Sequence, residues 1–315
     1  MKYALLAVIC CACYEQPPPQ LTFGPGPPPP RAAASLDELL HALPTNAPIV
    51  IAIDGASLRG SVLAQNLWRR MAALPEFAAR FGDPCMQTFT TTDRMVIAAP
   101  PSFSQVVAID QGLSQAAIAK CRDQPAYQRL LTDTHTEWKV WDRYEAIADA
   151  TNATQLSWVG PELSVIVHGP VAKQVPTEDL WVVGARIGRA GMQGPLDRPE
   201  VQRQLPDIKL DRTAPVWGLM LAKTGIVLAA SVHVTEVADF DIVFRTESPA
   251  AATELAERLA KLLEEGRLNG MISVGFATAN GDQVAVKAQL SEAQVWEWLV
   301  KQARAGSHRK LAAPE

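Results

Sequence analysis

The chain has 315 residues, of which 48% are hydrophobic and 20% charged, and its formal net charge is −4. This balance is typical of a globular protein with ample core material and argues against a disordered chain. A slight excess of acidic residues argues against a general nucleic-acid binder, which needs a basic surface, so we expect no nucleic-acid partner.

The first residues have the three parts of an export signal. Lys2 supplies a positive charge, Tyr3 to Ile9 form an apolar core, and small residues follow. The apolar stretch is too short for a transmembrane helix, which needs about 20 residues. We therefore expect residues 1–12 to be a signal peptide.

The cysteines at the end of this segment indicate which kind of signal it is. The segment resembles a bacterial lipoprotein signal, in which a small residue precedes a cysteine that becomes the lipid-linked N-terminus. Ala12–Cys13 fits this pattern best, Cys11 is the second candidate, and Cys10 fits least well because bulky Ile9 precedes it. The resemblance implies that Cys13 carries the lipid, although Cys10 stands where the family usually has leucine. The alternative is an ordinary secretory signal whose cysteines have no role.

Residues 13–34 follow as a spacer. From Gln16 to Pro30 the chain reads QPPPQLTFGPGPPPP, which predicts an extended, polyproline-like segment. Such a segment holds a folded domain away from a membrane to which the lipid anchors it. Tyr14 follows the cysteine in place of the aspartate that resembles an inner-membrane retention signal, so we expect an outer-membrane lipoprotein, facing the periplasm or the cell exterior.

Residues 35–182 are interpreted as a first α+β unit. Ser35 and Glu38 have capping-box spacing at its start, and later short segments rich in β-formers indicate an antiparallel meander. The expected elements are a helix from 35, strand 49–54, helix 57–74, strands 94–100 and 105–110, helix 114–121, and strands 137–143, 146–151, 154–160 and 162–169.

Three tryptophans of the meander, Trp138, Trp141 and Trp158, have two interpretations. They pack in the core, or they form an exposed aromatic platform for a glycan or a partner. The similar words VIAID at 50–54 and VVAID at 106–110 suggest a weak internal repeat or a coincidence of common strand letters.

Residues 183–212 form a glycine-rich and proline-rich connection with one short helix, and residues 213–304 form a second α+β unit. Its main helix is expected from Ser248 to Gly266, and Asn280–Gly281 is a favoured hairpin turn pair. Residues 305–315 are expected to be a polar tail. The expected buried positions are Leu255, Leu259, Leu262 and Leu263 in the main helix, and Val295, Trp298 and Leu299 in a last helix that opens at Ser291.

These elements predict an α+β protein with two sheet-and-helix units and mostly antiparallel sheets, the second resembling a split βαβ sandwich. With its lipid-type signal and proline-rich spacer, the chain resembles uncharacterised envelope lipoproteins of Gram-negative bacteria. This resemblance implies a location in the cell envelope and brings no catalytic residues with it.

Two functions stay open. The first is a lipid-anchored, non-enzymatic envelope protein that binds an envelope protein or another envelope component, with no cofactor and no metal. The sequence lacks G-x-S-x-G, H-E-x-x-H, phosphate-loop and C-x-x-C motifs. The alternative is a hydrolase-type enzyme whose site assembles only in the fold. It would use Asp54 or Asp110 with His135 or His168, although aspartates at strand ends are also common helix caps.

The lipid anchor can be tested directly. We expect Cys13→Ser to abolish partitioning into the detergent phase and membrane association in fractionated cells, because no thioether can form at serine. Unchanged membrane association of the variant would contradict lipidation at Cys13.

A disulfide is predicted between Cys85 and Cys121, because an exported protein folds where thiols are oxidised. The bond would close a loop of 36 residues, from 85 to 121, and stabilise the fold by about 3–4 kcal/mol. The alternative is two separately buried thiols. Mass measurement after alkylation of the denatured protein distinguishes the two alternatives. If the disulfide is present, both cysteines should be alkylated only after reduction.

Overall fold

The structure is a computed structural model of the chain. It describes residues 34–74, 91–100, 106–133, 135–141, 144–170, 183–184, 186–189 and 191–310. The predicted signal peptide, nearly all of the spacer, Cys13 and Cys85 lie outside the described residues, so the lipid site and the disulfide stay predictions.

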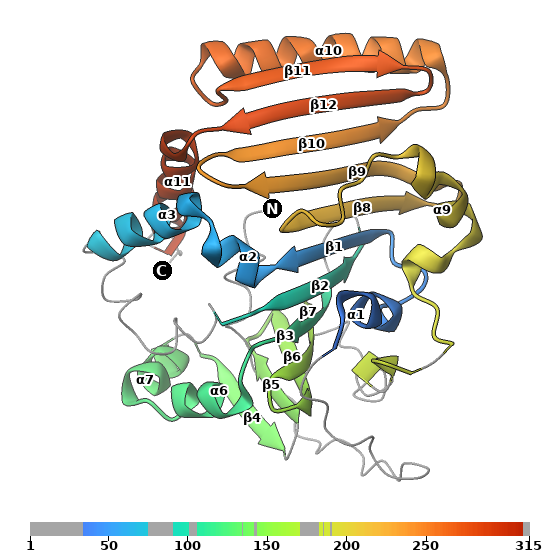
Figure 1. The fold of residues 1–315 in the computed structure, drawn as a ribbon. Coiled ribbons are helices and arrows are strands. Elements are labelled where there is room, and N and C mark those ends of the chain that lie inside the picture. Colours follow the sequence, from blue (N-terminus) through green and yellow to red (C-terminus); the bar gives the residue numbers. More distant parts are fainter. Residues whose placement is uncertain are drawn as a thin grey trace.

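Within the described residues, twelve strands form one sheet, in which every pair of neighbours is antiparallel (Figure 1). The strands are β1 (Ile49–Asp54), β2 (Arg94–Ala99), β3 (Val106–Gln111), β4 (Glu137–Trp141), β5 (Tyr144–Ala148), β6 (Asn152–Gly160), β7 (Leu163–Pro170), β8 (Val216–Ala222), β9 (Gly225–Val234), β10 (Ala238–Arg245), β11 (Val274–Asn280) and β12 (Gln283–Leu290). Their order is β11-β12-β10-β9-β8-β1-β2-β3-β7-β6-β5-β4. The predicted α+β class is confirmed.

Helices pack against both faces of this sheet. They are α1 (Leu36–Ala42), α2 (Gly55–Gly60), α3 (Val62–Ala73), α6 (Gln115–Arg122), α7 (Pro125–Asp133), α9 (Pro199–Gln204), α10 (Pro249–Leu268) and α11 (Glu292–Lys310), with short 3-10 turns η2 (Pro195–Asp197) and η3 (Leu205–Asp207). The connection over residues 183–212 therefore holds more helical structure than the one short helix that the sequence suggests, since its described residues include η2, α9 and η3.

The two predicted units share a single sheet, because β1 of the first pairs with β8 of the second. Ile49 lies opposite Met220, and Ile53 lies opposite Val216. The largest core cluster crosses this junction, since it holds Val50 of β1 together with Leu219 of β8. The sheet is therefore continuous from one unit to the other.

Alternate residues of the central strands face two different environments, since successive side chains in a strand point to opposite faces. Val50 is fully buried beneath α1 and α9, whose Leu39 and Val201 belong to the same cluster. On the opposite face, Ile51 and its neighbours in β8 and β9 are only half-buried. This second face is covered at its two ends, by α10, α3 and α11 on one side and by α6 on the other.

The end of the sheet at β11 has the predicted split βαβ arrangement. The chain runs from β10 through α10 to β11, and β12 then inserts between β10 and β11 (Figure 1). Ser248 caps α10, as expected, by accepting from the Ala251 N–H at 3.2 Å. The predicted end at Gly266 is wrong, because the helix continues to Leu268 and the left-handed turn is made by Gly270 at φ +70°.

Three helix predictions differ from the structure. The helix expected over 57–74 is divided into α2 and α3, because Ser61 leaves helical geometry and caps α3 through the Ala64 N–H. In α11, Trp298 is 52% exposed and Trp296 packs in its place beside Val295. α11 also extends to Lys310, through part of the expected tail. Among the described helices, none is both long and apolar enough to cross a membrane.

Candidate functional site

Asp54, one of the two candidate catalytic aspartates, acts as a helix cap. Its Oδ1 accepts from the Ser57 N–H at 2.8 Å, and its Oδ2 accepts from the Ser57 hydroxyl at 2.8 Å. Both oxygens therefore stabilise the first turn of α2, which is the favoured use of aspartate at this position.

Asp110, the other candidate, is a buried carboxyl at the end of β3, and only 1% of the residue is exposed. Its Oδ2 accepts from the Thr92 hydroxyl at 2.6 Å, and its Oδ1 accepts from the Leu113 N–H at 2.9 Å. Loss of hydration on burial raises the pKa of Asp110 to about 6, against the opposing effect of these two hydrogen bonds. The carboxyl closes the turn between β3 and α6.

The candidate histidines lie elsewhere. His168 Nδ1 is 2.9 Å from the Thr154 hydroxyl, and burial lowers the pKa of its ring. His168 pairs with Val106, at the opposite end of β3 from Asp110, so about 14 Å of strand separates the two residues. His135 is exposed in a turn with φ 49°. The fold thus does not bring together the four residues of the hydrolase alternative.

A second buried carboxylate, Glu145 on β5, was missed by sequence reasoning. Its Oε1 accepts from Trp158 Nε1 at 2.9 Å and its Oε2 from Trp138 Nε1 at 2.8 Å. Arg122 Nη1 lies 3.6 Å from Oε2. Trp158 is fully buried, so the aromatic platform is excluded for this residue, and its indole binds a partner inside the protein. The only sequence signal was a glutamate between two strand-forming residues.

Glu145 and its partners join three neighbouring strands at one end of the sheet, β4, β5 and β6, to the helix α6. Burying a carboxylate is costly unless it is fully hydrogen-bonded, and the two indoles and the guanidinium meet that need. The cluster is therefore a structural link. Among the described residues, no group of three or more His, Cys, Asp or Glu side chains is arranged to hold a metal ion.

Cys121 lies in the last turn of α6 and is 3% exposed. Its predicted disulfide partner, Cys85, is outside the described residues. The alkylation measurement remains the test of this predicted bond.

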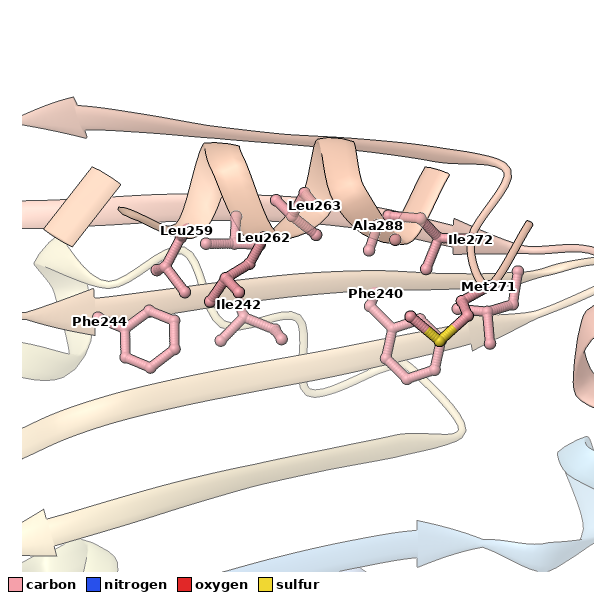
Figure 2. A pocket seen from close by; sticks show the side chains of 12 residues that line it. Phe240, Ile242, Phe244, Leu259, Leu262, Leu263, Met271, Ile272 and Ala288 are labelled. Atoms are coloured by element: carbon pink, nitrogen blue, oxygen red, sulfur yellow. The ribbon is translucent and has the colours of Figure 1, made fainter. Parts of the chain in front are cut away.

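One feature open to a ligand is an apolar groove between α10 and β10, with a volume of about 470 Å³. Figure 2 shows Phe240, Ile242 and Phe244 of β10 facing Leu259 and Leu262 of α10 across it. Every residue that lines the groove is apolar: Phe240, Ile242, Phe244, Leu259, Leu262, Leu263, Gly266, Met271, Ile272, Val286, Ala288 and Leu290. We call this feature the α10 groove.

The α10 groove exists because one helix is too narrow for the strands beneath it. A helix about 10 Å wide covers about two strands spaced 4.8 Å apart. α10 lies over β11, where Leu263 packs against Gly275, and over β12, where Ala256 clusters with Val284. The β10 side chains on this face are therefore left half-buried, with Ile242 as an example.

The other face of the same strands has the polar character of an ordinary solvent surface. Asp241 on β10 pairs with Lys287 on β12 at 2.5 Å, and Arg245 pairs with Asp282 at 3.0 Å. The alternation along β10 thus separates a charged face from an apolar face that helices cover only in part. An uncovered apolar face of this kind is a candidate interaction site.

Several residues of the α10 groove have a role that differs from the predicted one. Leu259, Leu262 and Leu263 were expected in the buried stripe of the helix. Leu262 is 61% exposed, because it projects past the edge of β12, and Met271 is 62% exposed at the end of the groove. The alternation of ADFDIVFR showed that β10 has an apolar face, but no sequence signal showed that this face would be left open.

The raised pKa of Asp110 predicts a pH dependence of stability. The folded protein holds a proton on Asp110 up to about pH 6, whereas the unfolded chain loses it near 3.8, so this group lowers stability as pH rises between these values. The loss amounts to about 3 kcal/mol. We expect Asp110→Asn to remove it, so that the stability of the variant relative to wild type rises by nearly this amount from pH 3 to pH 7 in urea unfolding.

A second variant checks the cause. Thr92→Val removes a hydrogen bond that favours the charged carboxylate, so the pKa of Asp110 should rise and the loss of stability should extend to higher pH. Parallel pH profiles for wild type and Asp110→Asn would contradict the assignment.

No protein-family model matches the chain, and no curated protein matches it. Among solved structures, the chain is similar to TP0453: its crystal form I aligns with a TM-score of 0.49 and 11% identity, covering 86% of this chain and 99% of that chain. Crystal form III gives a TM-score of 0.46 with 10% identity over 82% of this chain and 96% of that chain. Crystal form IV gives 0.45 with 10% identity over 82% and 95%. At these TM-scores and identities, the similarity carries no argument about what this chain does.

Proposed function

We propose that this protein is a lipid-anchored envelope protein that binds an apolar ligand in the α10 groove and catalyses no reaction. The lipoprotein-type signal with Cys13 and the proline-rich spacer support an outer-membrane anchor with the domain held away from the bilayer. The single observation that carries the binding role is the groove itself, which is half-open and lined only by apolar side chains.

The chemistry of the groove decides what kind of ligand it accepts. It offers no hydrogen-bond donor, acceptor or charge, so a polar ligand would lose its hydration without compensation. Apolar surface gains about 25 cal/mol for each Å² that is removed from water. The groove therefore favours ligands that present mainly hydrocarbon.

The polar clusters support a role other than catalysis. Asp54 and Asp110 stabilise turns, Glu145 is enclosed by its own partners, and His168 bonds to Thr154. The hydrolase alternative required one of the two aspartates to lie beside His135 or His168, and no observation on the described residues favours it. An envelope protein seated on the groove is the other binding alternative, and the following experiment separates it from a small ligand.

The proposal is tested with N-phenyl-1-naphthylamine, a neutral apolar probe whose fluorescence rises on leaving water. We expect saturable binding to the purified protein and a loss of affinity of about tenfold or more in Leu262→Glu, because the new carboxylate lies in the groove wall. Leu268→Glu is the matched control, since Leu268 is on the same helix, is 71% exposed and does not line the groove.

Equal losses in the two variants, or no saturable binding by the wild type, would contradict a ligand site in the groove. Near-normal urea unfolding of both variants shows that the comparison concerns binding and not folding. Probe binding in the absence of any other protein favours a small ligand over an envelope protein as occupant.

A further inference from the structure

We propose that the ligand of the α10 groove is a single linear acyl chain, which lies along β10 with its head group in water. This inference rests on the proposed binding function and specifies its ligand class. It follows from the shape of the groove, from its lining and from the way its two ends differ.

The groove is elongated in the direction of the strand. Phe240, Ile242 and Phe244 alternate along β10 and form its floor, which spans about 14 Å at 3.4 Å per residue. Leu259 to Gly266 form its wall over two turns of α10, or about 11 Å. Figure 2 shows these two rows side by side. A chain laid parallel to the strand contacts both rows along its whole length.

The dimensions and the lining favour a narrow, apolar occupant. A partner helix of the same length, about 10 Å wide, has a volume of roughly 1,100 Å³, so most of it would stand outside a groove of about 470 Å³. An extended peptide is disfavoured, because the backbone N–H and C=O groups on its groove side would meet only hydrocarbon. A chain of methylene groups is both narrow and free of polar atoms. Met271, which is unbranched and adaptable, suits such a chain at the end of the groove.

The two ends of the groove are not equivalent. At the Phe240 end, Met271 and Ile272 stand across the groove, and Phe240 and Leu290 also pack with Val295 of α11. Phe244 does not belong to this cluster and packs instead in the cluster that α10 forms with β12, with Ala252 and Val284. We therefore place the methyl end of the chain at Phe240 and the head group beyond Phe244. Since no lining residue is polar, the head group adds little to affinity.

This arrangement predicts selection by chain length and tolerance of the head group. The experiment measures displacement of N-phenyl-1-naphthylamine by straight-chain fatty acids from octanoate to stearate, and by lysophosphatidylcholines with the same chains, all below their micelle concentrations. Affinity should rise about fourfold per added methylene until the groove is filled and then stay level. Both head groups should reach the plateau at the same chain length, with one ligand bound per protein.

A variant at the Phe240 end of the groove tests where the acyl chain lies. Ala288 of β12 lies opposite Phe240, so Ala288→Leu should shorten the groove and move the plateau to a shorter chain by about three carbons, while short chains bind as before. Ala285→Leu is the control, because it makes the same change on the same strand but on the opposite, exposed face. Retained affinity for short chains shows that Ala288→Leu is folded.

The outcomes separate this inference from the proposed function. If the probe binds and Leu262→Glu weakens it, but acyl chains fail to displace it or show no dependence on length, the acyl-chain inference is wrong and the apolar site stands. If the probe does not bind to the wild type, the acyl-chain inference and the proposed binding function are both wrong. Binding to phosphatidylglycerol vesicles without saturable binding of monomeric lipids would assign the groove to a membrane surface and would also overturn the inference.

Discussion

The pairing of β1 with β8 is the contact on which the rest of this structure depends. Without it the two halves would present two sheets, each with an unpaired central edge of exposed N–H and C=O groups. With it, Val50 and Leu219 share one core cluster beneath α1 and α9, and the sheet extends without interruption from β4 to β11. Long-range backbone pairing, more than any side-chain contact, makes the two halves one body.

A continuous sheet of this width has more apolar surface than its helices cover, and the α10 groove is the result. One face is closed by α1, α9 and the connection that carries them, whereas the other has helices mainly at its ends. A single helix covers about two strands. The face of β10 next to α10 is therefore left partly open, and the proposed ligand site arises from the ratio of helix width to strand spacing.

Glu145 and Asp110 are buried carboxyl groups, and their partners inside the protein replace the water that they lose. Glu145 remains inside because two indoles and a guanidinium meet its oxygens, and Asp110 remains inside because its pKa is raised and its two hydrogen bonds close a turn. Perturbed groups of this kind often mark catalytic sites. Here each is enclosed by partners from its own fold, so its chemical role is to fix neighbouring elements, and the apolar groove carries the functional argument.

The sequence by itself determined the local elements of this protein and its fold class. Cap residues such as Ser35 and Ser248 and the alternation along β10 act within a few residues, so their effects can be read from the chain. The last hairpin was predicted one residue too early, because Asn280 pairs with Gln283 and the two turn residues are Gly281 and Asp282. The tertiary structure alone decided three things: that β1 pairs with β8, that Trp296 of α11 packs half-buried while Trp298 is exposed, and that Leu262 faces an open groove. The physical reason is that burial of a helix face depends on which strands lie beneath it. For the β1–β8 junction and for α11, which packs near Leu63 and Leu67 of α3, the partner lies more than 150 residues away in the chain, and for Leu262 the groove depends on how β12 inserts beside β10. No local pattern records either.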